Sequence, residues 1–402
     1  MKKIMILGAS ELQVPAIREA QKLGLLPVVV DMNPNAVGFR EENIVKVIES
    51  TIDKESVLRA AKDYQIDGII TLASDYPMRT VAYVADQMGL IGESETTARV
   101  TTDKGDMRKA LQRGKVKIPD FHIVKDEEDF YRCCQKCVGL DKKFILKPAD
   151  NSGSRGIVEL DDFQEKKILR ESYAYSRKNS RNGVVILEEK MEGLEVSVET
   201  ISYKGECRII QITDKLTTGA PNFVEMGHSQ PSLLSLEMRR NIEETAIQAN
   251  AALGIKCGPS HTEIIVTNEG AKVVEVGARL GGDCITTHLV PLSTGVNLVK
   301  AIIKIALGDK VDLEAKFCRG AAIRFFPSKN GVLESVSGLE EVRKMGGVRE
   351  LMFRKKPGDQ VRKIKNSTDR IGYVITDADD VETAVEICQK AIEKIDIQCR
   401  EE

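Results

Sequence analysis

The sequence has no excess of charge of either sign and no long hydrophobic run. Its 402 residues include 59 Lys plus Arg against 61 Asp plus Glu, which gives a formal net charge of −2. A chain this close to neutral is not expected to bind nucleic acid or an acidic membrane surface. No stretch approaches the roughly 20 apolar residues that span a bilayer, and the first apolar run ends at Gly8, too early for a secretory signal. We therefore expect a cytoplasmic protein without nucleic-acid or membrane partners.

The sequence also lacks the paired cysteines of a secreted, disulfide-bonded protein. It has nine cysteines, an odd number without a secretory context, and this predicts reduced thiols. Cys133, Cys134 and Cys137 could suggest a metal site. They fall in a predicted helix with no second cluster and no neighbouring His, so structural thiols are favoured.

Repeats and low-complexity linkers are absent, and 402 residues are enough for two or three compact domains. Lys3–Ser10 and Leu26–Val30 read as strands on either side of a helix that begins near Val14. The helix Lys54–Tyr64 and the strand Gly68–Leu72 continue this alternation. The N-terminal part therefore predicts a doubly wound, parallel α/β domain.

The most informative stretch is 257–283. Two apolar-rich runs, His261–Val266 and Ala271–Val276, flank a three-residue loop that ends in Gly270, which predicts a β-hairpin. Pairing Thr267 with Ala271 sets the register by the period of two along a strand. In that register the opposed pairs are Ile265 with Val273, Glu263 with Glu275 and His261 with Gly277, and the core-facing residues are Ile264, Val266, Val274 and Val276.

Two carboxylates directly opposite each other destabilise a sheet unless a cation compensates them. Mg2+ prefers oxygen ligands and usually takes only one or two protein carboxylates together with substrate phosphates. Glu263 and Glu275 are therefore candidate ligands of a metal–phosphate site. A solvated face with two unrelated glutamates is an equal alternative for the hairpin alone.

Two further segments carry features of a phosphate site. The strand Lys143–Pro148 is followed by the loop 150–156, in which Gly153 and Gly156 allow backbone N–H groups to converge on phosphate oxygens. Lys147 and Arg155 add positive charge, although an ordinary Gly/Ser turn explains the same residues. Lys104 falls in the first turn of a capped helix, where it either faces solvent or lies close to an anion.

The segment 184–199 predicts two strands joined by the connector 189–193. The backbone groups of a buried connector need hydrogen-bond partners, and the edge of an adenine base offers them. Glu195, at the start of the second strand, could accept hydrogen bonds from ribose hydroxyls.

Taken together, these motifs resemble the ATP-grasp superfamily over residues 1 to about 310. The resemblance implies two α+β lobes that clamp ATP, and a carboxylate that is phosphorylated to an acylphosphate before an amine attacks it. Glu263 and Glu275 match the family's magnesium ligands, with Mn2+ as an alternative metal. The residues implied to bind ATP are Lys104, Lys147, Ser152, Gly153, Ser154, Arg155, Gly156, Glu188, Glu189, Met191 and Glu195.

One position departs from the pattern Glu-x-Asn-x-Arg of many members, because Gly277 stands where they have Asn. A second metal ion is therefore in doubt. The branch that ligates amino acids, similar to bacterial L-amino-acid ligases, tolerates a small residue there, and the segments 227–232 and 278–282 also resemble that branch. The residues implied to contact substrate are His228, His261, Arg279, Gly281 and Gly282.

Arg279 and Lys147 are the residues that we expect to act in catalysis. Arg279 follows the strand that carries Glu275 and can present a planar fork to a carboxylate or an acylphosphate oxyanion. This role is favoured over that of a plain surface arginine. His228 could equally be a hydrogen-bonded structural histidine.

The expected architecture is an ATP-grasp fold with four parts. These are a Rossmann-like domain (1–95), a lid lobe (96–190), a catalytic lobe with the metal-binding hairpin (191–310) and a C-terminal α+β domain (311–402). The expected function is an ATP-dependent, ADP-forming ligase that joins a small carboxylate, such as an amino acid, to an amine, and a homodimer is left open. Alternatives are an ATP-grasp enzyme of purine-biosynthesis or carbamoyl-phosphate-synthase type and a catalytically silent ATP-binding module. A biotin carboxylase is disfavoured because the chain is short and has no Met-Lys-Met biotin site.

Overall fold

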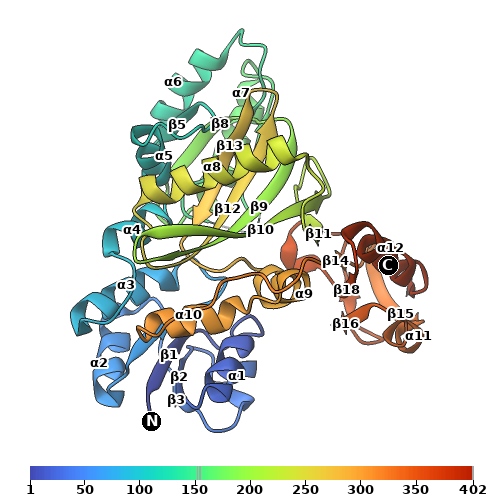
Figure 1. Cartoon of the computed structure of the whole chain (residues 1–402). Coiled ribbons are helices and arrows are strands. Elements are labelled where there is room, and N and C mark those ends of the chain that lie inside the picture. The colour runs from blue at the N-terminus through green and yellow to red at the C-terminus, as the bar shows by residue number, and fades with distance from the viewer. Residues whose placement is uncertain (152, 154, 401–402) are drawn as a thin grey trace.

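The computed structural model describes residues 1–151, 153 and 155–400. Figure 1 shows the N-terminal domain in blue, the two lobes in cyan to orange above it, and the C-terminal domain in red to one side. Ser152 and Ser154, which were predicted to bind ATP, lie outside the described residues.

The N-terminal sheet has four parallel strands in the order β3-β2-β1-β4, so the predicted doubly wound domain is confirmed. Ile4 and Ile6 lie in one hydrophobic cluster and Met5 and Leu7 in another, as the alternation along β1 requires. The elements are β1 (Lys3–Leu7), α1 (Val14–Lys22), β2 (Leu26–Val30), η1 (Val37–Arg40), β3 (Val45–Val47), α2 (Lys54–Tyr64), β4 (Gly68–Ile70), α3 (Pro77–Met88) and α4 (Glu95–Val100).

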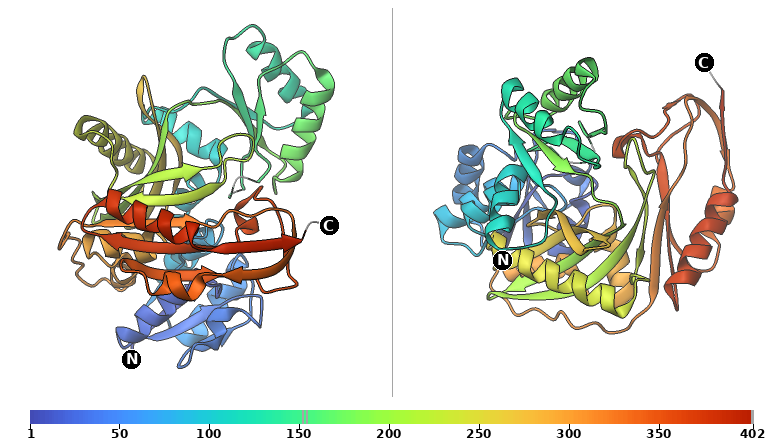
Figure 2. Two further views of the ribbon diagram at one scale, coloured as in Figure 1. Left: turned by 90° about the vertical axis from the view of Figure 1, so that its right-hand side faces the viewer. Right: turned by 90° about the horizontal axis from the view of Figure 1, so that it is seen from above.

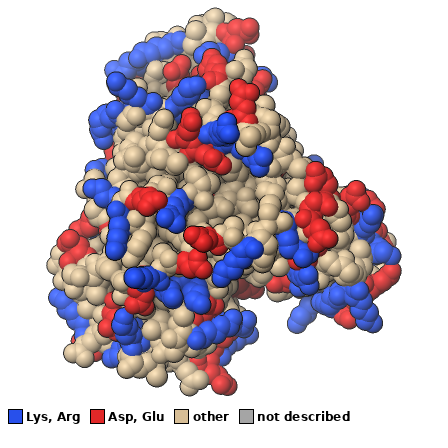
Figure 3. All heavy atoms as spheres, viewed as in Figure 1, with Lys and Arg blue, Asp and Glu red and all other residues tan. Residues whose placement is uncertain are grey.

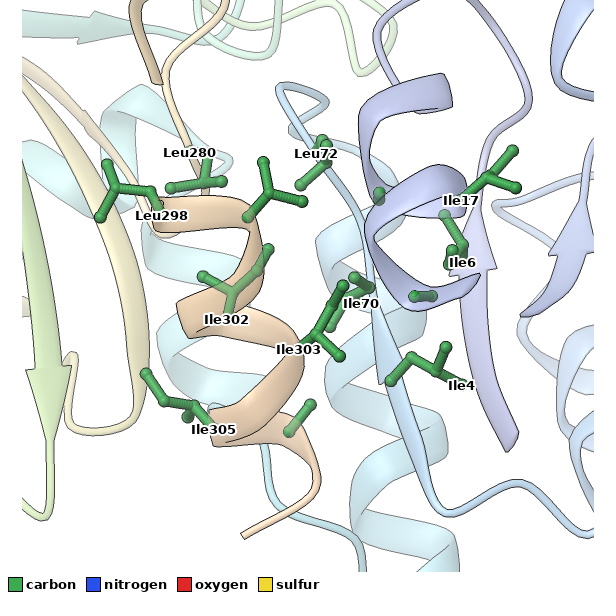
Figure 4. Packing of buried hydrophobic residues seen from close by; sticks show 14 of the residues in the cluster. Ile4, Ile6, Ile17, Ile70, Leu72, Leu280, Leu298, Ile302, Ile303 and Ile305 are labelled. Atoms are coloured by element: carbon green, nitrogen blue, oxygen red, sulfur yellow. The ribbon is translucent and has the colours of Figure 1, made fainter. Parts of the chain in front are cut away.

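One helix that covers the N-terminal sheet comes from much later in the chain. Helix α10 (Leu298–Ala306) packs against α1 and β4, and its Ile302 and Ile303 lie in the same cluster as Ile4 and Ile6 (Figure 4). This helix falls in the range expected for the catalytic lobe. Its burial fixes the N-terminal domain to that lobe through an apolar interface.

The lid lobe is a four-stranded antiparallel sheet in the order β5-β8-β6-β7, packed against two helices. Cys133, Cys134 and Cys137 are buried in its core beside Phe130, which agrees with structural thiols. Burial raises the pKa of the Cys134 thiol to about 12. The elements are β5 (Phe121–Val124), α6 (Glu127–Cys137), β6 (Phe144–Pro148), β7 (Val158–Leu160), α7 (Lys166–Lys178) and β8 (Val185–Glu189). Helix α5 (Lys104–Arg113), which was expected in this lobe, packs instead with its apolar face in the core of the catalytic lobe.

The catalytic lobe and the C-terminal domain share one eight-stranded sheet, in the order β13-β12-β9-β10-β11-β14-β18-β16. Helix α8 (Leu236–Leu253) packs on the first part of this sheet and buries Ile242, Ala246, Ala249 and Leu253, whereas Met238 is 41% exposed. The strands of this part are β9 (Leu194–Tyr203), β10 (Glu206–Thr217), β11 (Glu225–Gln230), β12 (Gly258–Thr267) and β13 (Gly270–Gly277).

The C-terminal domain adds three strands to the shared sheet and a small sheet of its own, β17-β15-β19 (Figure 2), and its helix α12 packs against β14 and β18 of the shared sheet. Two short helices, η2 (Ile285–Leu289) and α9 (Val290–Thr294), connect the hairpin to α10. The remaining elements are β14 (Gly320–Phe325), β15 (Gly331–Ser337), α11 (Leu339–Arg343), β16 (Val348–Phe353), β17 (Gln360–Val361), η3 (Ser367–Asp369), β18 (Gly372–Ala378), α12 (Val381–Glu393) and β19 (Asp396–Arg400).

Charged side chains of both signs intermingle over the face shown in Figure 3, as the near-zero net charge suggests. Within the described ranges, no single helix has both the length and the apolar composition needed to cross a bilayer. The segments Ile285–Thr294 and Leu298–Ala306 meet that test only as a pair, and they are bent by 112°.

Candidate active site

A pocket of about 200 Å3 lies between the lid lobe and the catalytic sheet. It collects most of the residues that were predicted to bind ATP and metal, from segments far apart in the sequence. Its lining includes Lys104, Lys147, Gly153, Arg155, Glu188, Glu189, Met191, Glu195, Glu263 and Glu275, together with Phe223, Glu225, Ile265 and Val274.

The two carboxylates at the floor of the pocket are paired across the hairpin, as predicted: Glu263 lies opposite Glu275 and His261 opposite Gly277. Lysines compensate both charges. The Lys104 Nζ lies 2.9 Å from Glu275, and the Lys215 Nζ lies 3.3 Å from Glu263. Burial opposes ionisation of Glu263, yet Lys215 and His261 hold its pKa well below the usual value.

The predicted register is wrong at the tip of the hairpin. Thr267 pairs with Gly270 rather than Ala271, which leaves a two-residue turn, and Ile264 pairs with Val273. Val274 is therefore the extra residue of a β-bulge, and it lines the pocket instead of facing the core. Val273 takes its place in the core.

Glu188 lies beneath the pocket in a buried triad with Arg108 and Lys147. Its carboxylate accepts hydrogen bonds from Arg108 Nε at 2.5 Å and Nη2 at 3.1 Å, and lies 2.6 Å from the Lys147 Nζ. Burial opposes its charge, but the two cations lower the pKa of Glu188 to about 2. Arg108 also donates to the carbonyls of Val273 and Val274, so it ties the bulge to the lid lobe. Glu188 therefore positions Lys147. Its carboxylate is bound by Arg108 and Lys147.

The connector after β8 has fewer free backbone groups than expected. The Glu189 N–H donates to Asp120 and the Lys190 N–H to Lys143, so these two donors are already satisfied within the lid lobe. Met191 and Glu195 still line the pocket. The Glu195 carboxylate lies 2.6 Å from the Lys215 Nζ, at the end of the pocket where a ribose ligand was predicted.

Arg279 and His261 are both buried and held by carboxylates. Arg279 Nε donates to Asp75 at 2.7 Å, and its guanidinium packs on Gly277, where an added Cβ would lie 3.1 Å from Nε. The side chain of Arg279 therefore occupies the space that the missing side chain of Gly277 leaves. Asp75 follows β4 at the crossover point of the N-terminal sheet, where α/β folds place their functional groups.

His261 is oriented by Glu199, whose Oε1 lies 2.5 Å from Nδ1, while Nε2 faces Glu263 at 3.4 Å. Burial lowers the pKa of His261, but Glu199 and Glu263 outweigh it and raise the pKa to about 9. Gly281 fits closely against this pair, because a Cβ there would lie 2.7 Å from the His261 Nδ1. The predicted substrate residues His261, Arg279 and Gly281 are thus brought together.

His228 is 2% exposed, and its Nε2 lies 3.4 Å from the Asp283 carboxylate. Asp283 in turn forms two hydrogen bonds with Arg370 of the C-terminal domain. His228 therefore lies close to the turn that follows Gly281 and Gly282, although it is 55 positions from Asp283 in the sequence.

Residues 140–287 match the ATP-grasp domain family, and residues 324–400 match the family of the L-amino acid ligase C-terminal domain 2. The chain carries an ATP-grasp domain. The predicted ATP-grasp fold and the predicted enzyme class, an ATP-grasp ligase, are thereby confirmed. Within this fold, the lid lobe and the catalytic lobe form the two sides of the pocket.

The relatives of this chain include two kinds of ligase. It is 26% identical over 330 residues to the alanine–anticapsin ligase of Bacillus subtilis, covering 75% of this chain and 68% of that one. The crystal structure of the L-amino acid ligase from Bacillus licheniformis superposes with a TM-score of 0.85 at 23% identity, over 100% and 99% of the two chains. That of phosphoribosylglycinamide synthetase from Anaerococcus prevotii superposes with a TM-score of 0.78 at 21% identity, over 99% and 100%. Solved neighbours include a complex with magnesium ADP.

Several residues of the ATP-grasp pocket were not found from the sequence. Lys215 is buried among Glu195, Glu225 and Glu263, which hold its pKa well above the usual value against the effect of burial. The other residues that were missed are Asp75, Arg108, Glu199, Glu225, Asp283 and Arg370.

Proposed function

We propose that this chain is an ATP-dependent, ADP-forming ligase that activates an amino acid or a related carboxylate as an acylphosphate and joins it to an amine. The observation that carries the proposal is the pocket itself. There Glu263 and Glu275 face each other, and Lys104 and Lys147 line the same pocket. Phosphoryl transfer asks a protein mainly for such positioning and charge neutralisation.

The donor set fits Mg2+. Both candidate ligands are carboxylates, and within the described residues no group of three or more His, Cys, Asp or Glu side chains could hold a metal on its own. Two carboxylates plus phosphate oxygens are the ligands that Mg2+ commonly takes, and Mn2+ would bind in the same way. The bound ion would neutralise charge on the phosphates.

In the proposed reaction, a carboxylate oxygen of the first substrate attacks the γ-phosphorus of ATP, and ADP leaves. The amine then attacks the carbonyl carbon, loses a proton, and displaces phosphate that retains one of the original carboxylate oxygens. Lys104 and Lys147 would stabilise phosphate charge, and Arg279, held by Asp75, would stabilise the oxyanion. Gly153 and Arg155 belong to a loop over the pocket that we propose excludes water.

The test follows the oxygen atoms. ADP release is first screened over single and paired amino acids with Mg-ATP. With an active pair, 18O placed in the carboxylate should appear in the released phosphate, and hydroxylamine should intercept the intermediate as a hydroxamate. Product formation without label transfer would exclude the acylphosphate route.

A second candidate is a phosphoribosylamine–glycine type of ligation, which the likeness to phosphoribosylglycinamide synthetase supports. The same assay separates the two, because this reaction would need phosphoribosylamine as the amine and glycine as the carboxylate. A silent ATP-binding module is disfavoured, since both glutamates and both lysines meet in the pocket.

A further inference from the structure

Arg370 belongs to the C-terminal domain, yet its guanidinium pairs with Asp283, directly after the predicted substrate residues Gly281 and Gly282. It follows η3 and precedes β18, and all three of its guanidinium nitrogens donate hydrogen bonds. Nη1 and Nη2 each donate to the Asp283 carboxylate at 2.7 Å, Nη1 also donates to the Glu225 carbonyl at 3.2 Å, and Nε donates to the Ser367 carbonyl at 3.0 Å. The guanidinium carbon lies 3.8 Å from the centre of the Phe325 ring. Only the planar fork of arginine can make this set of contacts.

The turn that Arg370 holds is conformationally strained. Asp283 and Cys284 are consecutive non-glycine residues in the left-handed region, with φ of 50° and 63°. Such residues persist only where the surrounding structure holds them, and they concentrate at functional sites. The bidentate ion pair with Arg370 supplies that restraint. Burial alone would raise the pKa of Asp283, but His228 and Arg370 lower it below the usual value.

The two segments joined by this ion pair each contain or contact residues of the candidate site. On one side, the turn begins with Gly281, whose N–H donates to Glu199, the residue that orients His261. On the other side, β11 begins at Glu225, which lines the pocket, and includes His228. The Nδ1 of His228 is buried and has no hydrogen-bond partner in the described part of the chain.

We propose that Arg370 is a positioning residue for substrate. Through Asp283 and the Glu225 carbonyl it fixes the turn 281–284 and His228 relative to each other, so that the C-terminal domain completes the substrate side of the site. It contacts none of the residues that we assign to metal binding. This inference rests on the proposed function and extends it to a residue outside the ATP-grasp domain.

The first test is steady-state kinetics of Arg370→Ala and Arg370→Lys in the full chain. We expect kcat/KM for the carboxylate and the amine to fall about tenfold to a hundredfold, the size expected for loss of a buried charge-assisted pair. The KM for ATP should change less than about twofold, because Arg370 bonds to none of the described residues that are predicted to bind ATP. Arg370→Lys should recover little, since one ammonium group cannot make both bonds to Asp283.

The matched control is Arg349→Ala. Arg349 also forms a bidentate pair, with Asp377 at 2.7 and 3.1 Å, in the same domain but outside the pocket. We expect wild-type kinetics from this variant. If Arg370→Ala and Arg370→Lys match it, or if they raise the KM for ATP as much as that for substrate, Arg370 has no positioning role.

Hydrogen exchange of the intact protein with bound Mg-ADP gives a readout that does not need turnover. The amides of residues 281–286 should exchange faster than in the wild type in both Arg370 variants. In Arg349→Ala their exchange rates should be unchanged. If exchange at 281–286 is faster in the variants but the wild type joins no carboxylate to any amine, Arg370 still fixes this turn and the proposed function is wrong. Unchanged exchange at 281–286 would overturn the inference while leaving the proposed function intact.

Discussion

Three glutamates of the pocket are each balanced by a cation from another element of the fold. Glu275 faces Lys104 of α5, Glu263 faces Lys215 of β10, and Glu188 faces both Arg108 and Lys147. Removing one member of a buried pair leaves the other charge uncompensated, which costs far more than removing an exposed pair. The pocket is therefore sensitive to single charge changes.

Glu275→Gln should lower turnover by about a hundredfold or more, because the neutral amide keeps the size of the side chain but loses the charge that would hold Mg2+. The measurement is ADP release against Mg2+ concentration, with thermal melting to show that the fold is kept. Glu269→Gln is the control, since Glu269 lies on the same hairpin and pairs with Lys272 at the exposed tip. Near-normal turnover of Glu275→Gln at limiting Mg2+ would reject the metal assignment.

Gly281→Ala should impair substrate use through His261. The new Cβ would lie 2.7 Å from the His261 Nδ1 and 2.9 Å from the Glu199 Oε1, so the imidazole or the turn must shift. We expect kcat/KM for substrate to fall about tenfold, in line with the effect of small displacements in active sites. Gly346→Ala, at a position where a Cβ meets nothing within 4 Å, should leave the kinetics unchanged. Equal kinetics of the two variants would show that His261 is not critical.

At the scale of single elements, the loop between β6 and β7 is the part of the lid lobe that we expect to respond to ATP. Gly153 has a φ of 69°, a conformation that β-branched residues rarely adopt. Gly153→Val should therefore raise the KM for ATP at least about tenfold. Gly139→Val is the matched control, because Gly139 lies in the same lobe, has a φ of 80°, does not line the pocket, and would place a Cβ with nothing within 4 Å. If both variants keep wild-type ATP kinetics, the loop is an ordinary turn.

The hairpin shows how far the sequence could be interpreted. Alternation placed Glu263 opposite Glu275 correctly, because both lie on the side of the bulge away from the turn. It failed at the tip, because a bulge at Val274 changes which residues face the core, and the carbonyls that it frees are bound by Arg108, 165 residues earlier. Only the three-dimensional structure brings that partner to the strand.

The ion pairs between domains could not be predicted for the same reason. Arg279 and Asp75 are 204 residues apart, and Asp283 and Arg370 are 87 apart. Each residue was visible in the sequence, and Arg279 was assigned a role there. Its partner depends on how the N-terminal domain docks, which composition and periodicity do not encode. The ligand-facing residues on regular strands were therefore easier to find than the residues that orient them.

At the scale of the whole molecule, Glu93 joins the N-terminal domain to the catalytic lobe. It lies 7% exposed before α4, and its carboxylate accepts hydrogen bonds from the backbone N–H groups of Lys256 and Cys257, directly before β12. A small apolar cavity at this interface is lined by Ile69, Val81 and Ile302 beside Glu93. Burial raises the pKa of Glu93 to about 7, more than the N–H groups lower it.

The raised pKa predicts how stability depends on pH. Folded Glu93 holds its proton up to about pH 7, whereas the unfolded chain releases it near the ordinary value of about 4.5, so the folded state binds more protons between these values. The contribution of Glu93 to the free energy of unfolding is full below pH 4.5 and is lost as the pH rises through 7.

Glu93→Gln keeps an acceptor for both N–H groups and carries no charge. It should therefore match wild type at pH 5 and exceed it at pH 8 by about 1 to 3 kcal/mol. Thermal melting from pH 5 to 8 measures the difference, with Glu95→Gln, at an exposed pair with Lys54, as the control. A difference between wild type and Glu93→Gln that stays constant with pH would mean that Glu93 does not titrate at this interface.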